Sequence, residues 1–136
     1  MQTNIYLFFD GDCEAAFKFY EACFGAKIET MMTNQGSPVE AETPPQWRTK
    51  ILHACLRTGS TTIMASDAPP GRSPGKPQGF YVSLGVDTPA EAERIFRELS
   101  ANGTVATAMD KTFFAERFGM CTDRFGIPWM VVCEKA

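Results

Sequence analysis

The chain has 136 residues, the size of one typical domain, and its 44% hydrophobic and 21% charged residues argue against disorder. The formal net charge of -3 leaves no basic surplus to neutralise phosphates, so a nucleic-acid partner is not expected. No apolar run approaches the roughly 18 residues of a membrane span, and the first residues lack the pattern of a secretory signal, so no membrane association is expected.

The first half of the chain reads as a β-α-β-β-β unit. Apolar runs predict strands at residues 5–9, 27–33, 51–57 and 61–66. An amphipathic helix is predicted after the first strand, because apolar residues recur at the spacing of a single buried face: Ala16, Phe19, Tyr20, Cys23 and Phe24. The proline-rich residues 34–50 are expected to be irregular, as a lid, a binding loop or a disordered segment.

Periodicity also assigns faces to the strands of this half. Gly59 and Ser60 occupy the place of a tight hairpin turn, which predicts three facing pairs: Arg57 with Thr62, Cys55 with Met64, and His53 with Ser66. One face is uniformly apolar and is predicted to lie against the helix; it consists of Leu52, Ala54, Leu56, Ile63 and Ala65. The other face is mixed and is predicted to line solvent or a pocket.

The second half repeats the first at an offset of 77 residues. This offset places Asp10 on Asp87, Glu14 on Glu91 and Phe19 on Phe96. The repeated helix opens with the capping box Thr88-Pro89-Ala90-Glu91, and its apolar face consists of Ala92, Ile95, Phe96 and Leu99. Strands are predicted at residues 80–86, 104–108, 113–122 and 128–134.

The predicted fold class is therefore α+β, with two tandem β-α-β-β-β modules in a single domain over residues 1–136. Module one covers residues 1–67 and module two covers residues 80–136. Residues 68–79 link the modules and are too rich in proline and glycine for a helix or strand.

Five cysteines, an odd number, form no C-x-x-C pair. They are expected to be buried thiols in a reducing compartment, which predicts a cytoplasmic protein without disulfides or a zinc cluster.

Several segments, in this order, resemble one family: Tyr6-Leu7-Phe8-Phe9-Asp10-Gly11, His53-Ala54, Met64-Ala65-Ser66-Asp67, Ala115 to Met120, and Phe125 to Met130. The chain resembles the PhnB-like branch of the glyoxalase, bleomycin-resistance and extradiol dioxygenase group, the vicinal oxygen chelate superfamily. The resemblance covers essentially the whole chain. It implies a glyoxalase-like fold, in which a curved mixed sheet encloses a cavity, usually within a homodimer.

Metalloenzymes of this superfamily place one ligand on each of four strands, and the resemblance carries these positions to Asn4, Met64, Tyr81 and Met130. Two thioethers, a phenol and an amide are poor ligands for a hard or borderline divalent cation. We therefore expect no catalytic metal and no cofactor. A site built from Asp67, Glu116 and His53 is the remaining alternative.

Two classes of function remain open. The first is binding of a small organic molecule in an aromatic and Met-lined cavity, as in the antibiotic-resistance members. Its predicted ligand-binding residues are Tyr6, Phe8, Met64, Tyr81, Phe118, Met120 and Met130. The second is a metal-independent enzyme of lyase or isomerase type, with His53 and Glu116 as the predicted catalytic residues for proton transfer.

Three further expectations concern the strand at residues 113–122, the two tryptophans and assembly. A one-residue slip in the strand at residues 113–122 decides whether Glu116 or Arg117 faces the cavity. Trp129 is expected to pack in the core, whereas Trp47 could close over a ligand. The apolar pairs Phe113-Phe114 and Phe8-Phe9 are expected to be buried between two copies of the chain, which predicts a homodimer. The other predicted partner is the small-molecule ligand of the cavity.

Overall fold

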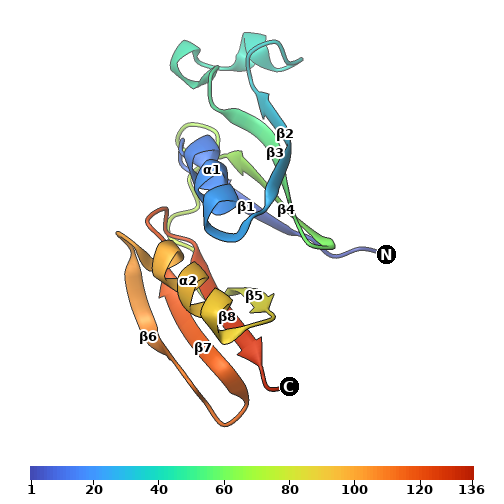
Figure 1. The fold of residues 1–136 in the computed structure, drawn as a ribbon. Helices are drawn as coiled ribbons and strands as arrows, with labels where there is room; N and C mark the ends of the chain where they lie inside the picture. The colour runs from blue at the N-terminus through green and yellow to red at the C-terminus, as the bar shows by residue number, and fades with distance from the viewer. The chain divides into compact units, whose positions relative to one another are not determined.

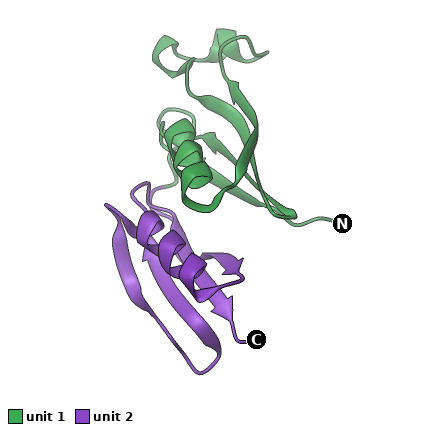
Figure 2. Ribbon diagram, viewed as in Figure 1, with its two compact units in different colours: residues 1–74 green, residues 75–136 purple.

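A computed structural model describes residues 1–136 and shows the same run of elements twice (Figure 1). The chain divides into two units, Met1–Pro74 and Gly75–Ala136 (Figure 2). The first unit contains β1 (Ile5–Phe9), α1 (Cys13–Phe24), β2 (Lys27–Thr33), β3 (Ile51–Thr58) and β4 (Thr61–Asp67), with short 3-10 helices at Glu40–Glu42 and Pro45–Trp47. The second unit contains β5 (Val82–Val86), α2 (Pro89–Ser100), β6 (Thr104–Asp110), β7 (Ala115–Thr122) and β8 (Pro128–Glu134).

The two sheets have the same topology. The strand orders are β1-β4-β3-β2 and β5-β8-β7-β6. In each sheet the first strand runs parallel to the fourth, and the remaining neighbours are antiparallel. The prediction of an α+β fold with two β-α-β-β-β modules is confirmed.

Each helix packs on one face of its own sheet, and α2 does so as predicted. Its buried residues are Ala92, Ile95, Phe96 and Leu99, and the Thr88 hydroxyl accepts a hydrogen bond from the backbone N–H of Glu91. The predicted face of α1 is partly wrong. Phe19 is only half-buried, whereas Phe17 and Cys13 are fully buried, because the helix presents its neighbouring stripe to the sheet.

The hairpin between β3 and β4 has the predicted register. Arg57 faces Thr62 and Cys55 faces Met64, and the ladder ends at Ala54 and Ala65, one residue short of the predicted His53–Ser66 pair. The predicted burial of Leu52 is wrong. The pairing of β3 with β2 shifts register there, so Ile51 enters the core at 1% exposure, and Leu52 turns to the opposite face.

Alternation in β1 separates the two faces of the first sheet. Leu7 and Phe9 are buried on the side of α1, and Phe9 packs edge-on against Phe17. Phe9 therefore belongs to the core and is not free for a dimer interface, contrary to expectation. Tyr6 and Phe8 are exposed on the side turned away from α1, which we call the helix-distal face.

Other boundaries differ by one or two residues, with β5 and β7 beginning at Val82 and Ala115. Trp129 is fully buried, as predicted. All five cysteines are free thiols; Cys55 is half-buried and the other four are buried. No helix is both long enough and apolar enough to cross a membrane.

Candidate functional site

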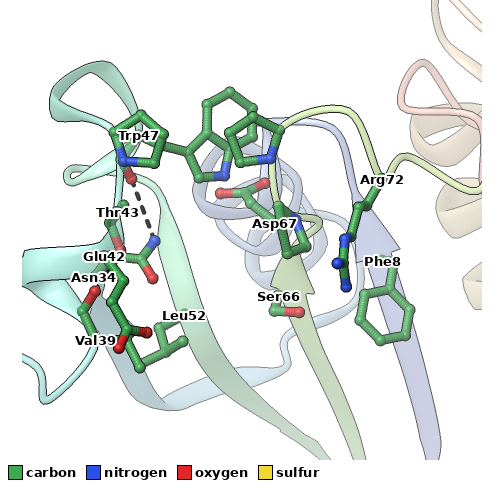
Figure 3. Close-up of a pocket in the computed structure, with 13 residues that line it drawn as sticks. Phe8, Asn34, Val39, Glu42, Thr43, Trp47, Leu52, Ser66, Asp67 and Arg72 are labelled. Atoms are coloured by element: carbon green, nitrogen blue, oxygen red, sulfur yellow. Dashed lines mark hydrogen bonds between the residues drawn. The ribbon is translucent and has the colours of Figure 1, made fainter.

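A pocket of about 650 Å³ lies over one end of the helix-distal face of the first sheet (Figure 3). Its floor comes from β1, β3 and β4, and its rim from residues 34–50 and from residues 69–72. The lining residues are Phe8, Asn34, Val39, Glu42, Thr43, Pro44, Trp47, Leu52, Ser66, Asp67, Pro69, Pro70 and Arg72. Among the predicted ligand-binding residues, Phe8 is the one that lines it.

Asn34 fixes the rim segment between β2 and β3. Its buried side-chain amide donates to the backbone oxygens of Trp47 (3.2 Å) and Lys50 (3.1 Å), and its backbone N–H also donates to Lys50 O. The backbone carbonyl of Asn34 accepts a hydrogen bond from the Ser37 hydroxyl at 2.6 Å. Residues 34–50 therefore form one wall of the pocket, and the Asn34 amide joins the two ends of this segment.

Trp47 packs this wall against the turn after β1. A Cβ added at Gly11 would lie 3.3 Å from the Trp47 ring, and the Lys50 ammonium donates to Gly11 O at 2.9 Å. Gly11 has φ +97°, a conformation that side chains other than glycine rarely adopt. The indole N–H of Trp47 is buried and has no hydrogen-bond partner in the chain.

Asp67, at the end of β4, joins three segments behind the pocket. Its Oδ1 accepts from the backbone N–H groups of Gly11 (2.9 Å) and Cys13 (3.0 Å), and its Oδ2 accepts from Ile51 N at 2.8 Å. Both oxygens are thus engaged by the backbone, so Asp67 is a poor candidate for the metal site considered from the sequence.

Burial and this carboxylate also change the acidity of neighbouring groups. Burial raises the pKa of Asp12, and repulsion from Asp67 and Asp10 adds to the effect. Burial likewise raises the pKa of the Cys13 thiol, again with repulsion from Asp67. Cys13 is therefore protonated near neutral pH and unsuited to act as a nucleophile.

Arg72 reaches the rim from a tight turn. Its backbone N–H donates to Pro69 O at 2.9 Å, and Gly71 has φ +77°, the pattern of a type II turn with Pro70 and Gly71 at its centre. In Figure 3 the Arg72 side chain extends beside the ring of Phe8.

The predicted catalytic histidine has a different partner from the one expected. His53 Nδ1 lies 3.1 Å from the hydroxyl of Tyr6, and the two rings stack at a centroid distance of 5.7 Å. Tyr6 also packs on Phe8, at 5.2 Å, and pairs with Met64 across the β1–β4 ladder. The structure therefore groups four predicted site residues on one helix-distal face: Tyr6, Phe8, His53 and Met64.

The remaining predicted residues belong to the second unit. Phe118 packs edge-on against Phe114 at 5.2 Å, and Met120 pairs with Met130 across the β7–β8 ladder. Tyr81 precedes β5 and is 38% exposed.

The strand β7 also distinguishes Glu116 from its neighbour. Arg117 donates to Glu93 of α2 at 2.9 Å, so Arg117 lies on the helix side of the second sheet. Glu116 is half-buried and falls at the register shift between Ala115 and Arg117.

No group of three or more His, Cys, Asp and Glu side chains is arranged to hold a metal ion. Around the four positions that the resemblance assigns to metal ligands, Met64 lies beside Tyr6 and Met130 beside Ser83. These neighbours offer a phenol and a hydroxyl, which do not turn either thioether into a site for a hard cation.

Sequence reasoning did not identify Asn34, Leu52 or Arg72 as pocket residues. For Arg72 a signal was present, because Pro-Pro-Gly predicts a type II turn that fixes the residue after it. For Leu52 none was visible, since the register shift that turns it outward depends on the pairing of β3 with β2.

Comparisons with known proteins point to one family. The model of the Glyoxalase/Bleomycin resistance protein/Dioxygenase superfamily matches residues 3–131. Protein YjdN of Escherichia coli is 36% identical over 141 residues, which cover 96% of this chain and 94% of that protein.

Solved structures share the fold over the whole chain. Protein PA1353 from Pseudomonas aeruginosa has a TM-score of 0.90 and 43% identity, covering 100% of this chain and 99% of its own. A PhnB protein from Bacillus cereus has a TM-score of 0.79 at 19% identity, covering 98% and 99% of the two chains.

Proposed function

The chain belongs to the Glyoxalase/Bleomycin resistance protein/Dioxygenase superfamily, and we propose that it binds a small organic molecule in the pocket of its first unit, without a catalytic metal. The observation that carries the proposal is the pocket itself. Its volume of about 650 Å³ is in the range of sites for small molecules, roughly 300–1,000 Å³.

The composition of the walls supports this proposal. Phe8, Leu52 and Trp47 provide aromatic and aliphatic surface, and Pro44, Pro69 and Pro70 add rigid apolar contacts. A few polar groups interrupt this surface, which is typical of a site that orients a ligand. A second pocket of about 380 Å³ shares Leu52 and includes Met32, so an extended ligand could reach a methionine there.

A thermal-shift screen against metabolites and antibiotics tests the proposal, because a ligand that binds only the folded chain raises its melting temperature. The test variants are Leu52→Trp, which fills the pocket from its floor, and Phe8→Ala, which removes part of that floor. Circular dichroism checks that both variants are folded. We expect compounds that stabilise the native chain to lose their effect in both variants. Equal stabilisation of all three proteins would contradict the proposed site.

The Tyr6–His53 hydrogen bond favours a second candidate function, metal-independent proton transfer. When the phenol donates to Nδ1, the neutral imidazole carries its proton on Nε2 and can donate a hydrogen bond to a ligand there. When Nδ1 donates to the phenol oxygen, Nε2 is a base. The pair can thus offer either form of the imidazole to a bound molecule.

Product analysis with the compounds found in the screen distinguishes the two functions. If the protein is an enzyme, we expect turnover that depends on pH and is abolished in His53→Gln, with a smaller loss in Tyr6→Phe. The same assay with Glu116→Gln tests the second predicted catalytic residue. A ligand that binds tightly and is recovered unchanged favours the binding function, and turnover that persists in His53→Gln excludes this histidine as the acid or base.

A further inference from the structure

Three polar side chains of the pocket lining are already bonded within the chain. The Asn34 amide and the Asp67 carboxylate serve backbone groups, as described above. The Thr43 hydroxyl donates to Val39 O at 2.8 Å. These three side chains build the walls and have little capacity left for a ligand.

Two nitrogen donors of the lining, on Arg72 and Trp47, are not used in this way. The Arg72 guanidinium takes part in none of the ion pairs of the chain, and the hydrogen bond that Arg72 makes comes from its backbone N–H. The buried indole N–H of Trp47 has no acceptor. Because a buried N–H without an acceptor destabilises the folded state, a ligand acceptor that reaches it contributes to binding.

Two side chains of opposite charge, Arg72 and Glu42, lie on different sides of the pocket rim. Figure 3 places Arg72 beside Phe8, and Glu42 at the other side of the pocket beside Val39 and Leu52. A negative group on the ligand is attracted by the guanidinium and repelled by the Glu42 carboxylate. In this view Leu52 and Ser66 lie between the two charges, and the Phe8 ring lies next to the guanidinium on its other side.

We infer that the ligand of this pocket is an organic anion, with an apolar, preferably aromatic, body on Phe8 and Leu52 and a carboxylate, sulfonate or phosphate group paired with Arg72. This inference rests on the proposed function and specifies its ligand class. The guanidinium is suited to the role because it binds oxyanions with two parallel N–H donors.

Two probes of nearly the same shape separate the charge from the apolar body. The anionic probe is 8-anilinonaphthalene-1-sulfonate and the neutral one is N-phenyl-1-naphthylamine, which lacks the sulfonate. Both report binding through fluorescence. The chain has two tryptophans, so the ¹H–¹⁵N resonance of the Trp47 indole, assigned with Trp47→Phe, shows whether a probe occupies this pocket rather than another apolar surface.

The variants are Arg72→Gln, which removes the charge, Arg72→Lys, which keeps it, and Arg97→Gln as a control for an exposed cation outside the lining. We expect Arg72→Gln to lower the affinity for the sulfonate probe about tenfold and to leave the affinity for the neutral probe within about twofold, since the charge-assisted hydrogen bonding to the sulfonate is lost. Arg72→Lys restores part of the affinity, and Arg97→Gln has no effect.

The outcomes separate the inference from the proposed function. One outcome is that the neutral probe shifts the Trp47 resonance and no longer binds to Leu52→Trp, while the affinity for the sulfonate probe is unchanged in Arg72→Gln. The pocket then binds ligands and the anion inference is wrong. If neither probe shifts the Trp47 resonance in the native chain and neither is affected by Leu52→Trp, the proposed function fails as well.

Discussion

The two units have the same topology, but they connect their second and third strands differently. In the first unit residues 34–50 join β2 to β3, whereas in the second only residues 111–114 join β6 to β7. The longer connection forms a wall of the pocket on the first sheet. A pocket of about 480 Å³ in the second unit is instead lined by turns around Gly103 and Arg124. One insertion thus distinguishes the unit with a candidate site from its repeat.

The helix-distal faces differ in chemistry at matching positions. Tyr6, Met64 and Cys55 lie side by side across the first sheet, and Ser83, Met130 and Met120 take the same places across the second. By this match Phe118 occupies the place of His53. The first unit therefore carries a hydrogen-bonded Tyr–His pair where the second carries a serine and a phenylalanine.

The beginnings of the helices differ as well. Thr88 has an extended backbone, with ψ 150°, and its hydroxyl accepts from Glu91 N. Asp12 has ψ 23° and makes no side-chain cap, so α1 is capped by Asp67, which accepts from Cys13 N. The Thr88 cap involves only residues at the start of α2, whereas the Asp67 cap couples the start of α1 to β4 and β3.

The largest expected effect comes from breaking this distant cap. Asp67→Asn replaces one acceptor oxygen by a donor facing backbone N–H groups, and we expect a loss of about 2–4 kcal/mol in the free energy of unfolding. Thr88→Ala, which removes only the local cap, should cost about 1 kcal/mol. Urea denaturation of both variants measures the difference. Equal losses would mean that Asp67 acts as no more than a helix cap.

A second comparison uses two glycines. Gly11→Ala forces a side chain into a left-handed backbone and against Trp47, so we expect a loss of about 1–3 kcal/mol in the free energy of unfolding and a looser wall of residues 34–50. Gly85→Ala is the control, because a Cβ there meets nothing within 4 Å.

Denaturation and Trp47 fluorescence report the two effects of Gly11→Ala separately. An unchanged emission spectrum in this variant would show that the indole does not depend on the glycine surface.

Sequence patterns correctly predicted features that depend on residues close together in the chain. The N-cap of Thr88 and the hairpin at Gly59-Ser60 each involve residues a few positions apart, and both are confirmed. The buried stripe of α1 was harder to predict, because Phe17 and Phe19 flank the stripe of Ala16, Tyr20 and Cys23 on opposite sides, and only the position of the sheet decides which of the two is covered. Pocket residues such as Leu52 and Asp67 depend on pairings between distant strands, which no short sequence window contains.

The difference between the units also bears on assembly, since the second unit carries the more exposed aromatic surface. Phe113 is 90% exposed at the β6–β7 connection and packs edge-on against Phe114. We propose that this pair is covered in a homodimer, and that Phe113→Ser weakens the association. Light scattering at micromolar concentration should give twice the 15.0 kDa mass of the chain for the native protein and a smaller value for the variant. A native mass near 15.0 kDa would contradict the dimer.

The smallest expected effect concerns Asp12, which occupies the N-cap position that Thr88 occupies in the repeat. Burial holds the pKa of Asp12 above its ordinary value of 3.8, so the folded chain retains this proton to a higher pH than the unfolded chain does. The free energy of unfolding therefore falls as the pH rises from about 4 through the folded pKa, because the folded state there binds more protons than the unfolded state. Asp12→Asn removes this contribution.

We accordingly expect Asp12→Asn to gain stability relative to the native chain as the pH rises from 4 to 7, and to show little difference near pH 3. Parallel urea titrations across this range measure the change, with Asp87→Asn as the control from the second unit. A stability difference that stays constant with pH would show that the carboxylate of Asp12 titrates alike in the folded and unfolded chains. In that case the repulsion of Asp12 by Asp10 and Asp67 would not distinguish the start of α1 from that of α2.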